Sequence, residues 1–387
     1  MTEAEGDVRA LPSPMGHLCH SMGLVKPQGG ELQPARTLAN QTLDLALVIP
    51  LHGSAGIFGP SCELCAQLAA EDVNAKGGIL ARELRLAVVD GSGPPGRIAD
   101  EVGALVAADL VGAVVGWHIS AVRQSLVPRV AGRVPYVYTA LYEGGERTPG
   151  VFMAGETPAR QLLPAMRWLR EEHGVRNWCI VGDDYVWPRI TAKAARVYAD
   201  LCDGRIAEEI FTPLGTTDFS RALQRVERCG ADAVLMLLVG EDAVHFNRAF
   251  AEAGLHDRCR RLSTLMDENM LLASGADNTR GICATAAYFE TLATPESLDF
   301  SLRYMQRFGP DAPTLNSLGE SCYEGILMLA ALARQAGSLD TRAMCAVADS
   351  VSYAGPRGEL QMRDRHLDQR VYLAEANDVE FDVIAQL

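Results

Sequence analysis

The chain has 387 residues, which is more than one typical domain contains and predicts two domains of roughly 150 to 200 residues each. Hydrophobic residues make up 48% of the chain and charged residues 22%, as in globular proteins with a large core. The net charge of −14, without a large cluster of Arg or Lys, excludes direct binding to nucleic acid, because phosphate contacts need concentrated positive charge.

The start of the chain predicts a tail. Residues 1–43 are rich in Pro, Gly and polar residues and show no periodic apolar pattern, so we expect them to be flexible. The acidic beginning and the lack of an apolar stretch before Cys19 predict neither a secretory signal nor a lipoprotein anchor. No apolar run of about 18 residues, the length that spans a membrane, follows later. We therefore expect a cytoplasmic protein with no membrane segment.

The ten cysteines are scattered and mostly lie inside apolar segments, which predicts reduced, buried thiols. The one CxxC pattern, Cys62 to Cys65, falls in a helical stretch with no second CxxC and no nearby His. Two packed helix residues are the better interpretation, and a metal or redox site is the less favoured one.

Strands and helices alternate through the first part of the chain. Apolar runs predict strands at 43–51, 82–90, 110–115 and 134–138, and apolar residues at helical spacing predict helices at 62–76, 97–108 and 121–130. The glycine-rich loop at 52–61 has neither P-loop nor dinucleotide spacing, so we interpret it as the edge of a cleft. This alternation predicts a parallel sheet with helices on both faces.

The pattern starts afresh after Gly155 and predicts a second lobe. Strands are expected at 177–181, 205–211, 233–239 and 261–265, and helices at 159–173, 190–201, 221–229 and 243–253. The run 281–289 is interpreted as a return crossing, and helices follow at 302–308 and 318–336. Strands at 358–362, 369–376 and 380–384 predict a hairpin-like ending. Two α/β lobes joined by several crossings leave a cleft that suits closure on a small ligand.

Two neighbouring loops of the first lobe follow strands and hold candidate ligand contacts. In a parallel sheet both loops lie at the carboxyl ends of strands, where such sheets bind ligands. Hydroxyls, aromatic rings and free backbone N–H groups at a helix start suit a small uncharged or anionic ligand. The candidates are Trp117, His118, Ser120, Tyr138 and Thr139. Ser120 also stands at the expected N-cap of a helix, and an ordinary loop with a capping serine is an equally supported alternative.

The second lobe offers facing candidates after its own strands. Tyr185 and Trp187, spaced i, i+2, can place both rings on one wall of the cleft, although Trp187 filling the core between the lobes is the alternative. Acidic residues follow two further strands. Helix capping is expected for Asp242 and Asp267, whereas Glu241 is a candidate for facing a ligand cation.

Known enzyme signatures are missing from the sequence. It has no GxSxG, no HExxH and no closely spaced His/Cys set, and its eight histidines are isolated. We therefore predict a non-enzymatic protein with no catalytic residue, no metal and no cofactor.

Several stretches resemble a known family. VGWHISAVRQSLVP, YTALYEG, GDDYVWPR, IFTPLGTTDFSRALQRVERCGADAVLMLLVG and AAYFETLATPES are similar to type I periplasmic binding proteins of the branched-chain amino acid class. Within that class, DDYVWPR and AAYFETLATPES resemble the cytoplasmic amide sensors that control aliphatic amidase and related nitrile hydratase operons. The resemblance covers about residues 44–382.

The resemblance implies two doubly wound α/β lobes joined by a three-crossing hinge. On this basis we expect lobe 1 at 44–154 and 286–350, and lobe 2 at 155–285 and 351–387. It also implies an amide pocket lined by Ser120, Tyr138, Tyr185 and Trp187, since hydroxyls and backbone groups match a primary amide without a charge partner. His118, Thr139-Ala140-Leu141 and Glu241 depart from the sensor pattern and bear on pocket shape and preferred amide.

The implied function is a small-amide sensor. Closure of the lobes on an amide would alter its hold on an RNA-binding, antitermination-type regulator and so control an amidase or nitrile hydratase operon. A homo-oligomer is also implied. The alternative is the solute-binding component of an ABC importer for amides, urea or branched-chain amino acids.

Overall fold

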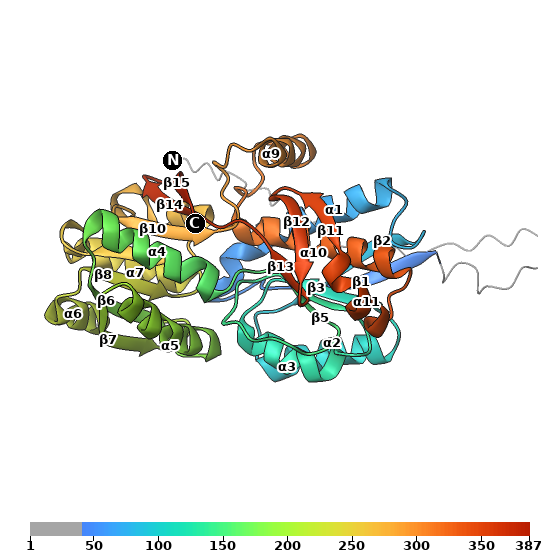
Figure 1. Cartoon of the computed structure of the whole chain (residues 1–387), viewed down its shortest axis with the longest axis horizontal. Coiled ribbons are helices and arrows are strands. Elements are labelled where there is room, and N and C mark those ends of the chain that lie inside the picture. Colours follow the sequence, from blue (N-terminus) through green and yellow to red (C-terminus); the bar gives the residue numbers. More distant parts are fainter. Residues whose placement is uncertain (1–40) are drawn as a thin grey trace, which may run out of the picture. The chain divides into compact units, whose positions relative to one another are not determined.

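The structure of the protein is a computed structural model that describes residues 41–387. This part of the chain forms two β-sheets, one of eight strands and one of seven, with helices on their faces (Figure 1). The two α/β lobes confirm the predicted fold class. The tail expected at 1–43 lies outside the described residues as far as residue 40, and Thr42 already begins the first strand.

The first sheet has the order β11-β12-β13-β5-β4-β3-β1-β2. Its strands are β1 (Thr42–Ile49), β2 (Glu83–Asp90), β3 (Ala113–Gly116), β4 (Tyr136–Tyr138), β5 (Val151–Met153), β11 (Ser352–Gly355), β12 (Gly358–Arg363) and β13 (His366–Asp368). β1 to β5 pair in parallel, whereas β11, β12 and β13 pair antiparallel. Helices α1 (Gly59–Ala75) and α10 (Ser317–Ala336) pack together, as do α2 (Pro95–Ala107) and α3 (Ser120–Val130) on the other side of the sheet (Figure 1).

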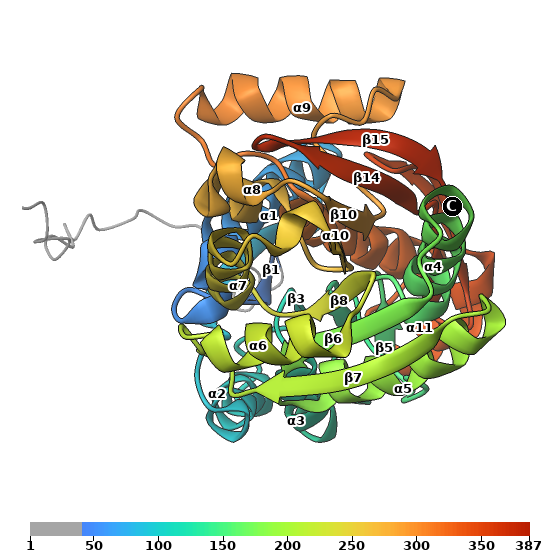
Figure 2. The ribbon, with the colours of Figure 1, turned by 90° about the vertical axis from the view of Figure 1, so that its left-hand side faces the viewer.

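The second sheet has the order β15-β14-β10-β9-β8-β6-β7. Its strands are β6 (Asn177–Asp183), β7 (Arg205–Thr212), β8 (Ala233–Leu237), β9 (Arg260–Ser263), β10 (Ile282–Ala286), β14 (Tyr372–Asn377) and β15 (Glu380–Gln386). Figure 2 shows α4 and α5 on one side of this sheet and α7 and α8 on the other. The bounds of these helices are α4 (Pro158–His173), α5 (Val186–Leu201), α6 (Ser220–Cys229), α7 (Glu241–Glu252) and α8 (Glu268–Ser274).

The inner strands read as unbroken apolar runs because helices cover both of their faces. All residues of β3 and of β8 are buried, and neither strand shows the alternation of a half-exposed strand. The first strand along the chain was predicted within a few residues for the same reason, whereas β2, also predicted within a few residues, lies at the edge of its sheet and is only partly buried. β4, with three residues, falls within the strand predicted at 134–138, whereas β5, also with three, is too short to give a strong pattern of its own and was not predicted.

The C-terminal strands divide between the two sheets. β11, β12 and β13 join the first sheet through His366, which pairs with Met153 of β5, whereas β14 and β15 join the second. The chain therefore crosses between the lobes for the last time after residue 368. We had placed this crossing at residue 351, ahead of three strands that belong to the first sheet. The run 281–289, expected to be a crossing, begins with β10, so that this crossing starts after Ala286. The helix expected at 302–308 extends back to Pro295 as α9 (Pro295–Phe308).

Buried polar contacts tie the three crossings together. A Glu156 carboxylate oxygen on the first crossing accepts from the backbone N–H of Ala287 on the second, 2.7 Å away. The Gln369 amide on the third crossing donates to the carbonyl of Ala154 on the first, at 3.1 Å. Gln369 in turn accepts from Arg357, which is ion-paired with Glu320 of α10. We call these side chains the hinge network.

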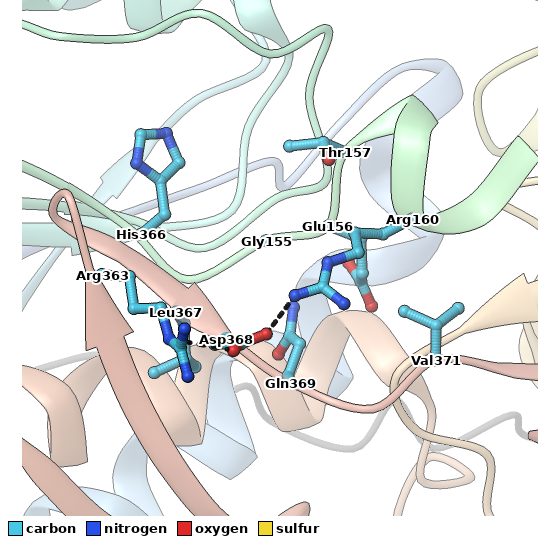
Figure 3. A pocket seen from close by; sticks show the side chains of 10 residues that line it. All are labelled: Gly155, Glu156, Thr157, Arg160, Arg363, His366, Leu367, Asp368, Gln369 and Val371. Atoms are coloured by element: carbon cyan, nitrogen blue, oxygen red, sulfur yellow. Dashed lines mark hydrogen bonds and ion pairs between the residues drawn. The ribbon is translucent and has the colours of Figure 1, made fainter. Parts of the chain in front are cut away.

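A pocket of about 230 Å³ lies beside this hinge (Figure 3). Arg160 of α4 and Arg363 of β12 both pair with Asp368 at its rim, so that the first ion pair joins the two lobes. None of the eight predicted ligand residues lines this pocket of the described chain. We therefore assign it to the hinge rather than to the ligand site.

Cys62 and Cys65 are buried in α1, which confirms their interpretation as packed helix residues. Among residues 41–387, no set of His, Cys, Asp and Glu side chains is placed to hold a metal ion. Within the same residues, no helix has both the length and the apolar character needed to cross a membrane.

Candidate functional site

The loops after five parallel strands converge where the lobes face each other. β3 and β4 supply the loops of lobe 1, and β6, β8 and β9 supply those of lobe 2. The short helix η2 (Ser54–Phe58), which follows β1, contacts α7 and α8, and α3 contacts α5. The two lobes are thus closely apposed here, and the ligand site expected between them stays a prediction.

Ser120 does not cap α3. It is the first residue of that helix, Ile119 occupies the N-cap position, and its hydroxyl donates instead to a carboxylate oxygen of Glu143 at 2.6 Å. The expected capping role was wrong because Ser120 lies one position past the N-cap, inside the first turn, and its hydroxyl donates to the loop after β4 rather than accepting from a backbone N–H of the helix.

Arg123, one turn further along α3, forms the centre of this part of lobe 1. Its Nη2 lies 2.6 Å from Glu143 and its Nη1 3.8 Å from Glu146, and its guanidinium packs on the rings of Tyr138 and Tyr142. Arg123 and Glu143 are both 3% exposed. Within residues 41–387, Nε and Nη1 of Arg123 have no hydrogen-bond partner. The sequence analysis missed both residues.

The side chain of His118 is fully buried. Its Nε2 and the hydroxyl of Tyr136 are 3.0 Å apart, and its carbonyl accepts from the hydroxyl of Tyr138 at 2.6 Å. Burial, helped by the positive charge of Arg123, lowers the pKa of His118 to about 3. A neutral His118 therefore orients this loop together with Tyr136 and Tyr138, and any direct ligand contact of His118 or Tyr138 stays a prediction.

The other two candidates of lobe 1 line the inner side of the loops. The hydroxyl of Thr139 lies 3.7 Å from the sulfur of Cys322 on α10. Trp117 packs edge-on against Phe58, with 4.8 Å between ring centroids, and its indole Nε1 has no acceptor among the residues described. Trp117 thus holds a buried donor without an acceptor in lobe 1.

Tyr185 and Trp187 stand together at the start of α5, as the spacing predicted. Their ring centroids are 6.2 Å apart, and Trp187 is buried with an indole Nε1 that finds no partner in the described part of the chain. The pKa of Tyr185 is raised well above its usual value, first by burial and then by Asp183, Tyr138 and Glu143. Since Tyr138 and Glu143 belong to lobe 1, Tyr185 lies against the opposite wall.

Asp183 and Asp242 form a buried acidic pair beneath Tyr185. Burial first, and then Asp242, raise the pKa of Asp183 well above its usual value. Asp242 accepts from the backbone N–H groups of Gly215 and Thr216 rather than capping its own helix, which corrects the capping role expected for it. Glu241, the first residue of α7, is exposed.

Asp267 caps α8, as predicted: one carboxylate oxygen accepts from the backbone N–H of Met270 at 2.8 Å. The other oxygen, Oδ2, is buried and has no partner within residues 41–387. Burial raises the pKa of this carboxyl to about 7, against a usual value of 3.8. Asp267 also lies close enough to lobe 1 to raise the pKa of Cys62.

Asp267→Asn is expected to change the pH dependence of stability. Because the folded pKa lies above the unfolded one, the folded protein holds this proton more tightly, so stability falls as the pH rises from about 3.8 to about 7. Asparagine keeps a good helix cap but cannot titrate, so the variant lacks that fall. Urea unfolding of both proteins at pH 4, 5.5 and 7.5 measures the difference, and parallel curves would contradict it.

Two α/β lobes, each built on a mixed sheet and joined by three crossings, are the architecture of a two-lobed binding protein. A family model for periplasmic binding proteins matches residues 42–380, and the chain belongs to that family. This is a family of binding proteins rather than enzymes, which confirms that prediction.

Relatives place the chain near the Leu/Ile/Val-binding proteins. It is 27% identical over 239 residues to "Leu/Ile/Val-binding protein homolog 6" of Brucella melitensis and of Brucella abortus, matching 59% of this chain and 60% of each relative. The match thus spans about 60% of the length of these relatives.

Solved structures share the fold. A solute-binding protein of an ABC transporter from R. palustris, in complex with 4-hydroxybenzoate, matches 89% of this chain and 96% of its own with a TM-score of 0.78 and 20% identity. The isoleucine-bound LivJ of Streptococcus pneumoniae matches 89% of this chain and all of its own with a TM-score of 0.76 and 18% identity.

Proposed function

We propose that the chain binds a small polar organic solute between its lobes and serves as the solute-binding component of an ABC-type importer. Support comes from the family and from relatives that bind isoleucine or 4-hydroxybenzoate. The proposal makes the loops after β3, β4, β6 and β9 the ligand site.

The observation that carries the proposal is a complementary set of buried polar atoms on the facing loops. Lobe 1 presents donors on Arg123 and Trp117, and lobe 2 presents carboxyl oxygens on Asp183 and Asp267, none of them matched by a partner within residues 41–387. A buried polar atom without a partner costs about 1 to 3 kcal/mol, which a solute bearing both an acceptor and N–H groups would recover. Aromatic rings of Tyr185 and the adjoining indole suit its apolar part.

The amide sensor is the second candidate. Its supporting observation is that Arg123 already faces the two carboxylates of Glu143 and Glu146, which suits a neutral amide. On this proposal the chain is cytoplasmic, and lobe closure alters its hold on an antitermination-type RNA-binding regulator of an amidase or nitrile hydratase operon. A homo-oligomer belongs to the same proposal.

Isothermal titration of the full chain tests the binding function. The panel consists of isoleucine, 4-hydroxybenzoate, butyramide and urea, and we expect micromolar affinity for at least one class. Absence of binding to every member would sink the proposal. Affinity capture from the source cells then separates the two roles: recovery of a membrane permease supports the importer, and recovery of an RNA-binding regulator supports the sensor.

A further inference from the structure

A second cavity, of about 350 Å³, lies on lobe 1 where the C-terminal ends of α1 and α10 meet β11. Helix α10 contacts both α1 and β11, and the three elements lie side by side in Figure 1. All of the lining residues belong to lobe 1, and none of them is a predicted ligand residue or lines the hinge pocket. The volume falls in the range of about 300 to 1,000 Å³ in which proteins bind small organic molecules.

The floor of this cavity is apolar. Ile79, which follows α1, is 2% exposed, and Val73 on the last turn of α1 is 5% exposed. Leu327 and Ala330 of α10 are half-buried and stand one turn apart, so both side chains face the same way. The apolar body of a small molecule would therefore find packing partners on two helices.

A tight turn forms one rim of the cavity. Ile79 and Arg82 exchange two backbone hydrogen bonds of 3.0 Å, and Leu80 and Ala81 between them have φ values of 53° and 60°. Residues with a side chain rarely adopt this left-handed conformation, so the surrounding structure must hold the turn in place. The Arg82 guanidinium does so by donating to the carbonyl of Thr42 on β1 at 2.9 Å. The rim is thus formed in advance of any binding, with the 40% exposed Leu80 at its edge.

The mouth of the cavity is positively charged, in a chain whose net charge is −14. Lys76 and Arg334 both line it, and no lining residue is acidic. Glu71 and Asp72, the acids that precede Lys76 along α1, are instead paired with arginines of α9. Lys76 and Arg334 stand at the ends of α1 and α10, where a helix carries about half a negative charge. Each full positive charge outweighs that half charge, so the mouth stays positive.

From the apolar floor, the preformed rim and the two cations, we propose that lobe 1 has a second ligand site, separate from the cleft, for a small amphipathic carboxylate. Its apolar body packs on Ile79, Leu327 and Ala330, and its carboxylate lies at the mouth beside Lys76 and Arg334. This site goes beyond the proposed solute binding and does not depend on it. Since one lobe supplies every lining residue, the site is complete whether the lobes are open or closed.

Titration calorimetry of the full chain with three ligands of one shape tests the charge preference. The ligands are phenylpropanoate, phenylpropanamide and phenylpropylamine, which share an apolar body and differ in the charge of the head group. We expect the acid to bind about fivefold more tightly than the amide, as two exposed cations allow, and the amine to bind most weakly. Rising ionic strength should narrow the difference between acid and amide, because exposed charges are screened.

Two variants locate the binding. The double variant Lys76→Gln/Arg334→Gln should lower the affinity for the acid to that for the amide and leave the amide unchanged. Both positions are exposed, so this variant should fold. Ala330→Phe, which fills the cavity from α10, should lower the affinity for acid and amide alike by at least about tenfold. Arg129→Gln, at an exposed ion pair on the other side of the sheet, is the control and should change neither.

Each other outcome overturns the inference. An affinity for the acid that survives both Ala330→Phe and the double variant places the binding outside this cavity. Equal affinities of the three ligands for the unmodified protein show that the cations select nothing, and no binding of the acid at millimolar concentration shows that no site exists. Because Ala330 lies far from the loops proposed to bind solute in sequence and lines none of them, a cleft solute should bind Ala330→Phe and the unmodified protein equally well. Failure of the cleft solutes therefore bears on the proposed function alone.

Discussion

Gly240→Ala is expected to fold and yet to lose about a hundredfold in affinity for solute, which corresponds to about 3 kcal/mol. Gly240 precedes α7 in lobe 2, and a Cβ atom placed on it would overlap the carbonyl oxygen of Ser54 in η2 of lobe 1. The obstacle is backbone, so a change of rotamer cannot relieve it. The added methyl group therefore holds the lobes apart, and the facing polar groups no longer meet on one solute.

Gly230→Ala is the matched control for this variant. Gly230 ends α6 in the same lobe with a φ of 62°, close to the 52° of Gly240, and an added Cβ meets no described atom within 4 Å. Alanine at Gly230 (φ 62°, ψ 40°) carries the strain of the left-handed helical region, about 1 kcal/mol, and alanine at Gly240 (φ 52°, ψ −118°) carries more, so the two variants are compared by their affinity for solute and not by their stability. Only Gly240→Ala blocks closure. Small-angle scattering should show a larger radius of gyration for Gly240→Ala alone. Equal affinities in the two variants, measured with a solute that the unmodified protein binds, would refute the steric argument.

Arg357→Met is expected to lower the free energy of unfolding by about 3 to 5 kcal/mol, because it leaves a buried carboxylate without its partner. Arg357 is ion-paired with Glu320, and the two side chains are 1% and 0% exposed. Glu324 and Glu156 are close enough to contribute to the same charge balance. Removing the one guanidinium leaves three acidic side chains around it, and methionine replaces its packing but not its charge.

The loss should depend on pH. Burial already raises the pKa of Glu320 well above its usual 4.5, and Arg357 opposes that rise. Without Arg357 the pKa of Glu320 in the folded protein is higher still. The variant therefore loses most stability at a pH where Glu320 would be charged, and it recovers part of that stability as the pH falls and Glu320 is protonated. Urea unfolding at pH 7.5 and pH 5 measures both effects. Arg258→Met, at an ion pair 57% exposed on both sides, is the control and should cost about 1 kcal/mol or less.

The repeated strand and helix pattern was sufficient to predict two α/β lobes. Strands such as β1 and β8 could be predicted from their long apolar runs, because these parallel strands are buried on both faces. The sequence did not show which lobe each C-terminal strand joins, because β13 and β14 lie close together in the chain and yet pair with distant strands of different sheets, β5 some 200 residues earlier and β10 some 90 residues earlier. Only the spatial pairing tells which sheet each one completes.

The candidate site could likewise be predicted only in part. Ser120, Tyr185 and their neighbours were predicted because they lie in loops after strands, and the topology of a parallel sheet determines where the strand ends lie. The Arg123–Glu143 pair could not be predicted, because a helical arginine and a glutamate beside two glycines are typical of exposed positions. Their burial depends on a contact across twenty residues of chain, and so does the changed role of Ser120.

The division of the C-terminal strands between the sheets has a consequence for folding. Residues 352–368 complete one sheet and residues 372–386 the other, with only a short crossing between them. During synthesis, therefore, neither lobe can close its strand pairing until the last thirty-odd residues have emerged. Closing these long loops carries an entropic cost that both lobes share, which favours slow, coupled folding and a single unfolding transition over two independent ones.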